Sequence, residues 1–474
     1  MKSTLLFSLI AAAAPALAPV GSLAAPGSPP HIIHIVADDL GWKDVGFHGC
    51  TDIKTPNLDK LAGEGVRLDQ FYVQAMCTPT RAALMTGRYP LRYGLQTIVI
   101  PSKGTYGLDT EETTLPQVLK AAGYRTTMVG KWHLGHADQK YWPRQRGFDY
   151  HYGAVLGEID YFTRSAHDVI DWQRDNKTVE EEGYVTQLLG DDAVRIISAH
   201  DASKPLFMYL AFTAPHTPYQ APPEYLERYK GIADETRRAY AGQVACLDDE
   251  IGKVISALEK KKMRENTLVF FHSDNGGTRD ASMTGESKVK SVPCDNGPLR
   301  AGKGTLYEGG TLVPAFANWP GHLKPGAVRE LIHVSDILPT YAALAGASTK
   351  ECKPLDGMDV WPAIAEGKPS GRSEIVYNVE PFRAAVRQGN WKLVWKNLLP
   401  TNVELFDLAA DPYEKTNLAE QQPAKVRELQ ARIEELARES AKPLFMKAAM
   451  DAVFSGIFGP APIPTEENTA TAEP

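Results

Sequence analysis

The sequence predicts an α/β fold with a mostly parallel sheet between helices, and two observations support this prediction. Four apolar runs rich in β-branched and aromatic residues each have the length of one buried strand; they are residues 32–37, 126–129, 206–212 and 267–271. Stretches with helical spacing, such as 115–122 and 239–258, lie between these runs. Buried strands that alternate with helices are typical of a parallel sheet that is covered on both faces.

Composition excludes several protein classes. Of the 474 residues, 43% are hydrophobic and 23% are charged, which excludes a chain that is disordered, collagenous or coiled-coil throughout. The net charge of -7 argues against non-specific binding of nucleic acid, and we expect no nucleic-acid partner. The chain has 5 cysteines, an odd number, so one thiol is left over if the others pair.

The N-terminal 24 residues are expected to form a signal peptide. Lys2 precedes the apolar stretch 5–10 and an alanine-rich segment, and Ser22-Leu23-Ala24 is a cleavage site of the small-x-small type. The alternative is a disordered N-terminal tail. No later stretch reaches about 18 uninterrupted apolar residues, so we expect no stable membrane insertion. The expected protein is exported, either periplasmic or secreted, and its compartment permits disulfides.

The character of the sequence changes near residue 371. Three short apolar runs predict strands of a small antiparallel sheet; they are 384–387, 391–395 and 403–408. Pro423 then opens a helix whose apolar face carries Val426, Leu429, Ile433 and Leu436. The end of the chain is rich in Pro, Thr, Glu and Ala and is expected to be flexible. The expected division is a signal peptide (1–24), a large α/β domain (25–370), a small α+β subdomain (371–445) and a tail (446–474).

Polar side chains follow each of the four predicted strands. These clusters are Asp38-Asp39, Lys131-Trp132-His133, His216-Thr217-Pro218-Tyr219 and Asp274-Asn275-Gly276-Gly277. In open α/β sheets ligands bind beyond the carboxyl ends of the strands. We therefore expect groups from distant parts of the sequence to converge on one site.

Residues 77–87, C-T-P-T-R-A-A-L-M-T-G, predict the start of a helix. Thr78 is a good capping residue and Pro79 suits the first helical position. Cys77 then faces the positive end of the helix dipole, and Arg81 adds a bidentate cation for an oxyanion. The alternative interpretation is a capped core helix with a structural cysteine.

This segment resembles the signature of the type I sulfatases, in which the cysteine is oxidised to Cα-formylglycine (3-oxoalanine). A second family signature, G-Y-R-T-T-M-V-G-K-W-H, is present at residues 123–133. D-D-L-G-W, H-T-P-Y, S-D-N-G-G and G-K-G-T-L-Y-E-G-G also occur, and the order between about residues 31 and 418 is that of the family. The resemblance implies a sulfuric ester hydrolase of the arylsulfatase type, with an alkaline-phosphatase-like sheet and a small C-terminal antiparallel sheet plus helix.

The resemblance also implies a calcium site. Its ligands would be Asp38, Asp39, Asp274, Asn275 and an oxygen on the modified Cys77. All are hard oxygen donors, as calcium requires. No His/Cys spacing in the sequence suits zinc.

The implied mechanism assigns a role to each remaining residue. Hydrated formylglycine at position 77 supplies the nucleophilic hydroxyl, which the metal activates. Arg81, Lys131 and Lys303 hold the sulfate oxygens and stabilise charge in the transition state. His216, beside Lys303, protonates the leaving oxygen, so Lys131, His216 and Lys303 also bind substrate. His133 deprotonates the second hydroxyl of the hydrate, which releases sulfate.

The implied substrate is a sulfated polysaccharide or oligosaccharide, and the implied partner is a formylglycine-generating maturation enzyme. T-G-R-Y-P-L-R-Y-G-L-Q and A-A-V-R-Q-G-N-W-K-L resemble sulfatases that act on 4-O-sulfated N-acetylgalactosamine, which favours a 4-O-sulfated galactose or galactosamine unit. Segments 141–187, 291–300 and 377–383 are expected to bind the sugar. Three aromatic residues there either stack on sugar rings or belong to the core; they are Trp142, Tyr161 and Trp172. Three arginines there are candidates to meet further anionic groups; they are Arg144, Arg146 and Arg164.

Two other functions stay open at this stage. One is a phosphonate or phosphodiester hydrolase of the same superfamily. The other is a non-catalytic glycan-binding protein, if Cys77 is unmodified. With Cys77 converted, four thiols remain, which either form two disulfides of undetermined pairing or stay free; they are Cys50, Cys246, Cys294 and Cys352.

Overall fold

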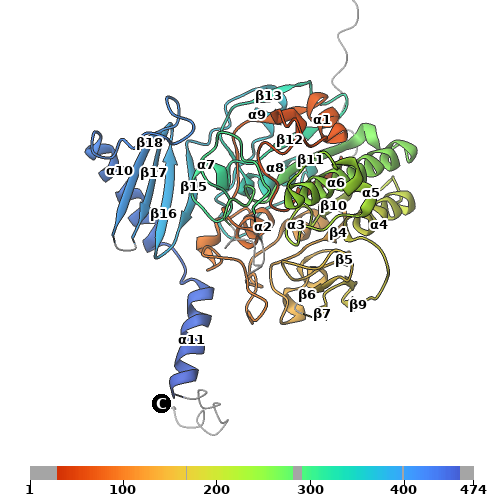
Figure 1. Cartoon of the computed structure of the whole chain (residues 1–474), viewed down its shortest axis with the longest axis horizontal. Helices are drawn as coiled ribbons and strands as arrows, with labels where there is room; N and C mark the ends of the chain where they lie inside the picture. Colours follow the sequence, from red (N-terminus) through yellow and green to blue (C-terminus); the bar gives the residue numbers. More distant parts are fainter. Residues whose placement is uncertain (1–28, 167, 281–290, 398–399, 459–474) are drawn as a thin grey trace, which may run out of the picture.

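The larger part of the chain is built on a central sheet between layers of helices (Figure 1). The computed structural model describes residues 29–166, 168–280, 291–397 and 400–458. Within these residues the sheet is 10-stranded, in the order β13 (Gly326–Val328), β2 (Val66–Leu68), β12 (Ala315–Asn318), β11 (Thr267–Ser273), β1 (His31–Ala37), β10 (Leu206–Ala211), β4 (Arg125–Gly130), β5 (Tyr150–Gly153), β8 (Gln173–Arg174) and β9 (Lys177–Thr178).

The central strands of this sheet are parallel. β11, β1, β10, β4 and β5 all run in the same direction. Antiparallel pairs join the outer strands, apart from the parallel pair of β13 and β2. The prediction of an α/β fold with a mostly parallel sheet is therefore confirmed.

Strand β1 shows why both faces of the sheet are covered. Ile33 and Ile35 pack into one hydrophobic cluster, whereas Ile32 and Val36 pack into another. Successive side chains of a strand point to opposite faces, so an apolar run without alternation supplies two apolar layers. The helices that contribute to the first layer are α1 (Pro56–Gly63), α4 (Val185–Ala199), α5 (Pro223–Arg228) and α6 (Glu235–Lys260). Those of the second are α2 (Cys77–Thr86), α3 (Leu115–Ala121), α8 (Ile337–Ala345) and α9 (Trp361–Glu366).

Short elements complete the larger domain. Two small two-stranded sheets pair β3 (Phe71–Tyr72) with β14 (Ile332–His333) and β6 (Ser165–Ala166) with β7 (Val169–Ile170). Helix α7 (Glu308–Thr311) lies in the loop between β11 and β12. The 3-10 helices are η1 (Gly46–His48), η2 (Pro90–Arg92), η3 (Gln139–Tyr141), η4 (Pro143–Arg146), η5 (Arg264–Asn266) and η7 (Val334–Asp336).

The four predicted strands and both predicted helices occur where the sequence placed them. The runs 32–37, 126–129, 206–212 and 267–271 correspond to β1, β4, β10 and β11, and the two helical stretches to α3 and α6. The other strands of this sheet were not predicted. They have only two to four residues each, which is too few for a periodic pattern of apolar residues to be recognised in the sequence.

A separate antiparallel sheet follows the larger domain, as predicted (Figure 1). Its strands are β15 (Glu374–Val379), β16 (Arg383–Gln388), β17 (Trp391–Lys396) and β18 (Asn402–Asp407). The last three strands were predicted from the sequence, whereas β15 was not. One face packs against helix α10 (Pro423–Arg438), which buries Leu429, Ile433 and Leu436. Each of these side chains contributes about 1.5–3 kcal/mol by leaving water.

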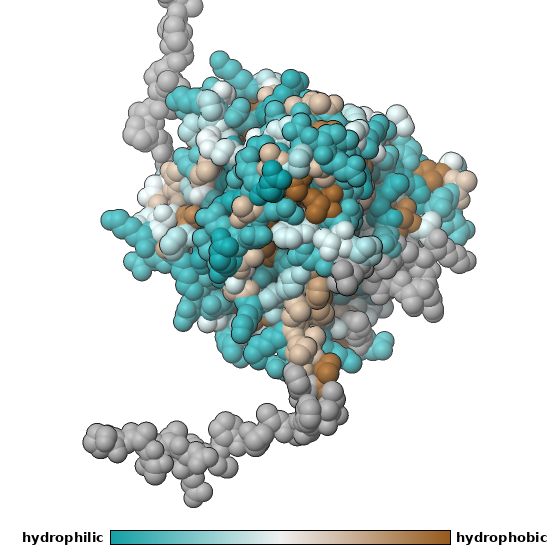
Figure 2. Space-filling model, turned by 90° about the vertical axis from the view of Figure 1, so that its left-hand side faces the viewer, coloured by the Kyte–Doolittle hydropathy of each residue, from teal (hydrophilic) through white to brown (hydrophobic). Residues whose placement is uncertain are grey.

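The described chain ends in helix α11 (Leu444–Phe458), which projects from the body beyond the C-terminal sheet (Figure 1). We expected a flexible tail from residue 446, but the segment up to Phe458 is helical, and its alanines and methionines are good helix formers. The rest of the predicted tail and the predicted signal peptide lie outside the described residues. No helix in the described part of the chain has the length and apolar character needed to cross a bilayer. Figure 2 shows that the face on the side of the C-terminal sheet is mostly hydrophilic.

A buried charge cluster joins the C-terminal sheet to the larger domain. Lys392 on β17 is fully buried, and its Nζ lies 2.9 Å from a carboxylate oxygen of Glu308 and 2.8 Å from one of Glu414. The hydroxyls of Tyr72 and Tyr377 each donate to Glu308 at 2.8 Å. Because Glu308 begins α7, this cluster fixes the loop before α7 against the small sheet.

We expect Lys392→Met to destabilise the protein by about 3–5 kcal/mol, because it leaves two buried carboxylates without their shared cation. The measurement is urea unfolding followed by fluorescence. Lys230→Met is the matched control: Lys230 pairs with Glu227 at a site where both side chains are exposed, and we expect a change of about 0–1 kcal/mol. Equal effects of the two substitutions would contradict the anchoring role of the cluster.

Candidate active site

The polar clusters that follow the four strands meet at one edge of the sheet, as expected. The backbone N–H of Asp39, after β1, donates to Asp274, after β11, at 3.2 Å. Lys131, after β4, reaches Asp38 at 2.5 Å. His216, in the loop after β10, lies 3.6 Å from Asp39. The parallel register of β11, β1, β10 and β4 brings these residues together from sequence positions more than two hundred apart.

Helix α2 carries Cys77 into this cluster. The helix begins at Cys77 with Met76 as its N-cap, so the expectation that Thr78 caps the helix is wrong. The Thr78 hydroxyl instead donates to the carbonyl of His133 at 2.9 Å and accepts the N–H of Ile100. Thr78 therefore ties the helix to the loop after β4.

Carboxylate and amide oxygens surround the side chain of Cys77. Its Sγ lies 3.3 Å from Oδ1 of Asp38 and 3.5 Å from Oδ1 of Asn275. Asn275 donates its amide N–H to Asp39 at 2.7 Å. All of these side chains, and Asp274 with them, are buried.

Burial and nearby carboxylates keep Cys77 protonated. Desolvation, followed by the charges of Asp274 and Asp38, raises the pKa of the Cys77 thiol well above its usual range. A thiolate is the nucleophilic form of cysteine, so the unmodified side chain is a poor nucleophile here.

Three buried cations lie beside three buried carboxylates; they are Arg81, Lys131 and Lys303, and Asp38, Asp39 and Asp274. Lys131 bonds Asp38, and Lys303 donates to Oδ2 of Asp39 at 2.7 Å. Burial alone would lower the pKa of each lysine, but neighbouring carboxylates outweigh it and the pKa of each is raised. Both side chains therefore stay cationic.

Arg81 is committed to the cluster itself. Its Nε and Nη2 both donate to Oδ2 of Asp274, at 3.1 and 2.8 Å, and Nη1 donates to the carbonyl of Lys131 at 2.9 Å. The guanidinium is 1% exposed. These contacts orient Asp274 and the loop after β4.

His216 and Lys303 form a hydrogen-bonded pair. Nε2 of His216 lies 3.1 Å from Nζ of Lys303, and Nδ1 lies 2.6 Å from the carbonyl oxygen of Thr217. Because a carbonyl only accepts, Nδ1 carries the ring proton and Nε2 accepts from the ammonium. Burial and the charge of Lys303 lower the pKa of His216 to about 3, so the ring is neutral and the additional proton of the pair is on Lys303.

His133 presents an unpartnered nitrogen. Its Nε2 lies 3.2 Å from the carbonyl of Ile100 and therefore carries the proton, which leaves Nδ1 as a buried acceptor with no partner in the described part of the chain. Burial, then the charges of Lys131 and Arg81, lowers the pKa of His133 well below its usual range. A neutral ring with a free lone pair is able to take a proton.

The donor set fits a hard divalent cation. One ligand atom from each of Asp38, Asp39, Cys77 and His216 lies within 4.8 Å of the others, and Asp274 and Asn275 add further oxygens beside them. Nε2 of His216 accepts a hydrogen bond from Lys303, and a nitrogen is not the donor that a hard cation prefers. The remaining oxygens match the preference of calcium.

Most of the candidate sugar-binding residues belong to the core. Tyr161 and Trp172 are fully buried, so they do not stack on a sugar ring. Arg146 is also buried and donates to the backbone carbonyls of Asp109 and Glu112, and Arg164 donates to the carbonyl of Gly183. Trp142 is half-buried, and Arg144 lies 3.3 Å from Asp175.

All five cysteines are free in the structure. The four thiols other than Cys77 are therefore unpaired, which was one of the two alternatives left open by the sequence.

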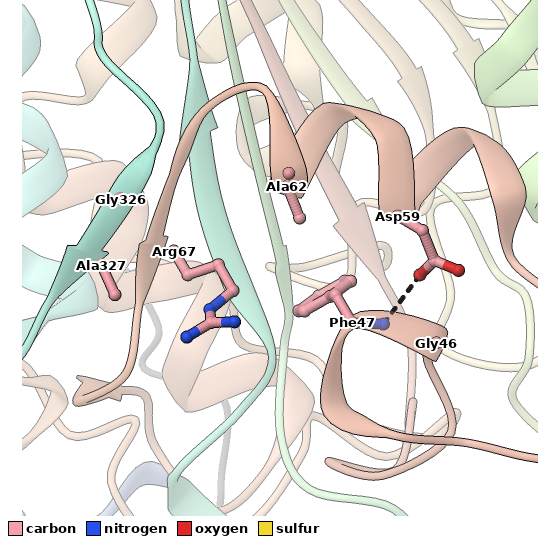
Figure 3. A pocket seen from close by; sticks show the side chains of 8 residues that line it. Gly46, Phe47, Asp59, Ala62, Arg67, Gly326 and Ala327 are labelled. Carbon is pink, nitrogen blue, oxygen red and sulfur yellow. Dashed lines mark hydrogen bonds between the residues drawn. The ribbon is translucent and has the colours of Figure 1, made fainter.

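A cavity of about 530 Å³ lies elsewhere, beside η1, α1, β2 and β13 (Figure 3). The carboxylate of Asp59, which lines the cavity, accepts a hydrogen bond from the backbone N–H of Phe47 at 2.8 Å. Its lining contains none of the predicted site residues; it consists of Gly46, Phe47, Asp59, Ala62, Gly63, Arg67, Gly326 and Ala327.

Comparisons with known proteins agree with the chemistry of the cluster. The family model described as Sulfatase matches residues 30–347. Arylsulfatase J of Mus musculus is 36% identical over 464 residues, which cover 86% of this chain and 75% of the relative. N-acetylgalactosamine-6-sulfatase of Homo sapiens is 34% identical over 405 residues, which cover 80% and 75%. The solved structure of Ps i-CgsB is 34% identical with a TM-score of 0.80, covers 88% of this chain and 94% of that chain, and has a counterpart in complex with k-i-k-neocarrahexaose.

We expect Gly157→Ala to lower kcat for an aryl sulfate about tenfold or more, because reacting groups tolerate little misplacement and the proton transfer assigned to His133 follows departure of the leaving group. A Cβ at Gly157 would lie 2.1 Å from Cε1 of His133, so the ring must move. Gly231→Ala is the control, since its Cβ meets nothing within 4 Å. Unchanged turnover in Gly157→Ala would show that the position of His133 does not matter for the reaction.

Proposed function

Because the chain belongs to the sulfatase family and is a sulfuric ester hydrolase, we propose that it removes 4-O-sulfate from galactose or N-acetylgalactosamine units of a sulfated glycan, with formylglycine at position 77 and a calcium ion. The observation that carries this proposal is the buried cluster around Cys77. It combines oxygen ligands for a cation with two lysines for a sulfate group.

Formylglycine at position 77 is supported by the state of the cysteine. The thiol is buried among carboxylates that keep it protonated, so cysteine itself serves poorly there. The hydrated aldehyde supplies a hydroxyl nucleophile and a second hydroxyl that allows sulfate to be released. Since Cys77 is 1% exposed, the maturation enzyme must reach it before this part of the chain folds.

The residues that would hold calcium are Asp38, Asp39, Asp274 and Asn275, together with the oxygen at position 77. When bound, the ion polarises the sulfate and lowers the pKa of the attacking hydroxyl. Arg81 holds Asp274 in place through two hydrogen bonds to one carboxylate oxygen. Its role in this proposal is to orient a ligand, in addition to the electrostatic field it adds for the sulfate.

The lysines and histidines bind sulfate and move protons. Lys131 and Lys303 are buried and supply positive charge for the sulfate oxygens. The proton for the leaving oxygen comes from the Lys303 Nζ–His216 Nε2 pair. Nδ1 of His133, which has no other partner among the described residues, takes the proton from the second hydroxyl of the hydrated residue 77.

The substrate class is supported by relatives. Hydrolysis of sulfate esters of sulfated glycans follows from the family and from neighbours that include an N-acetylgalactosamine-6-sulfatase and a structure solved with an oligosaccharide. The choice of the 4-O position rests on the two sequence stretches that resemble 4-sulfatases. Export by the N-terminal signal peptide, to a periplasmic or secreted location, belongs to the same proposal.

We expect mass spectrometry of the peptide that contains residue 77 to show loss of sulfur and gain of an aldehyde after expression with a maturation enzyme. Cys77→Ala is expected to lower turnover about a thousandfold or more, because the nucleophile is lost. Cys352→Ala, at a half-buried cysteine outside the cluster, is expected to leave turnover unchanged. A retained thiol in an active enzyme would refute the formylglycine assignment, and full activity of Cys77→Ala would refute the nucleophile.

A second measurement compares substrates. We expect hydrolysis of an aryl sulfate at a kcat/KM at least tenfold above that of the matching aryl phosphate and phosphonate esters, and a preference for 4-O- over 6-O-sulfated N-acetylgalactosamine. Preference for the phosphate or phosphonate would favour the other hydrolase of the superfamily. Binding of the sulfated sugars without turnover would favour a non-catalytic glycan-binding protein. Preference for the 6-O isomer would correct the proposed position alone.

A further inference from the structure

The loop that carries His216 is held at its backbone by two side chains from other parts of the chain. The hydroxyl of Tyr161 lies 2.8 Å from the carbonyl oxygens of both Thr213 and His216. Gln243 lies on helix α6, and its side-chain amide nitrogen donates to the carbonyls of His216 and Pro218, at 3.2 Å each. The carbonyl of His216 thus receives hydrogen bonds from two sources.

Tyr161 is itself fixed in place. Its N–H donates to Oε1 of Gln220 at 2.9 Å, and its carbonyl accepts the N–H of Val185 at 2.9 Å. Its ring stacks on that of Tyr184, with centroids 5.4 Å apart and an interplanar angle of 21°. The side chain is fully buried and belongs to the hydrophobic core, so the hydroxyl has a single defined position.

The two carbonyls that Tyr161 reaches are the two ends of one turn. The N–H of His216 donates to the carbonyl of Thr213 at 3.0 Å, which closes the turn. One hydroxyl shared between both carbonyls therefore fixes the turn as a unit. Burial raises the pKa of Tyr161 well above its usual range, so the hydroxyl stays a donor at neutral pH.

We propose that Tyr161, assisted by Gln243, is a positioning residue that sets Nε2 of His216 against Lys303 and the leaving oxygen. This inference rests on the proposed function, in which the His216–Lys303 pair protonates that oxygen. The polar contacts made by the ring nitrogens, among the described residues, are those with Lys303, Asp39 and the carbonyl of the adjacent Thr217, so the backbone that Tyr161 holds helps to orient the ring.

The expected effect of displacing His216 depends on the leaving group of the substrate. General acid catalysis requires the donor to lie within hydrogen-bond reach of the leaving oxygen. A sugar alcohol is a poor leaving group and needs the proton, whereas a nitrophenolate leaves without one. A displaced His216 should therefore slow hydrolysis of sugar sulfates selectively.

The test is Tyr161→Phe, which keeps the ring and removes the hydroxyl. We expect kcat for the sulfated sugar to fall about tenfold or more, with KM changed less than about twofold, and kcat for 4-nitrophenyl sulfate to change less than about twofold. Tyr124→Phe is the matched control: Tyr124 is also buried, but its hydroxyl donates to the carbonyl of Pro30 at 2.9 Å, and both substrates should be unaffected.

Two results would overturn the positioning role: an equal fall on both substrates, which marks a general structural effect, and no change on either. If Tyr161→Phe does not fold, Gln243→Leu removes the second anchor and is expected to show the same selectivity, to a smaller degree. Failure of the proposed function is distinguishable, because the unsubstituted enzyme would then hydrolyse neither sulfate ester. A large loss on the sugar sulfate with retained aryl turnover supports the inference.

Discussion

The arrangement of the whole site depends on one constraint, the mutual neutralisation of buried charges at the carboxyl edge of the sheet. Asp38, Asp39 and Asp274 are buried there with Arg81, Lys131 and Lys303. An ion removed from water costs several kcal/mol unless opposite charges and hydrogen bonds satisfy it. Loss of any one member leaves an uncompensated charge in the interior. The side chains must therefore be supplied by rigid elements that hold all six together, and parallel strands with two packed faces meet this requirement.

Two members of the cluster are not carried by a strand end of the parallel sheet. Arg81 lies on helix α2. Lys303 lies in the loop between β11 and β12, and the C-terminal sheet holds that loop from outside. The guanidinium of Arg383 on β16 donates to the carbonyl of Gly304, and Lys392 on β17 binds Glu308 at the start of α7. The small subdomain is thus part of the scaffold of the site. Its own stability depends on α10 on one face and on the larger domain on the other.

The sequence predicted the framework because apolar periodicity reports burial directly. The strands, the main helices and the convergence of Asp38, Lys131, His216 and Asp274 all follow from that pattern and from the rule for strand ends. The hydrogen-bond partners of buried polar side chains produce no comparable periodic pattern in the sequence. His34 lies within a run interpreted as apolar, yet its ring bonds His272 at 3.0 Å and Tyr341 at 2.8 Å across the sheet. The tie between Thr78 and the carbonyl of His133 was missed for the same reason.

The balance of charge in the cluster also bears on how it takes its ligands. Three carboxylates and three cations leave the site close to neutral, so a divalent cation alone would add positive charge to a buried region, and the monoanionic sulfate group of an ester alone would add negative charge. Bound together, the two partly neutralise each other. Each ligand therefore lowers the electrostatic cost of the other, a coupling that is reciprocal by thermodynamic necessity. Lys131 and Lys303 bond Asp38 and Asp39, so under the proposed function a cation held by these carboxylates would compete with both lysines and free their ammonium groups for the sulfate.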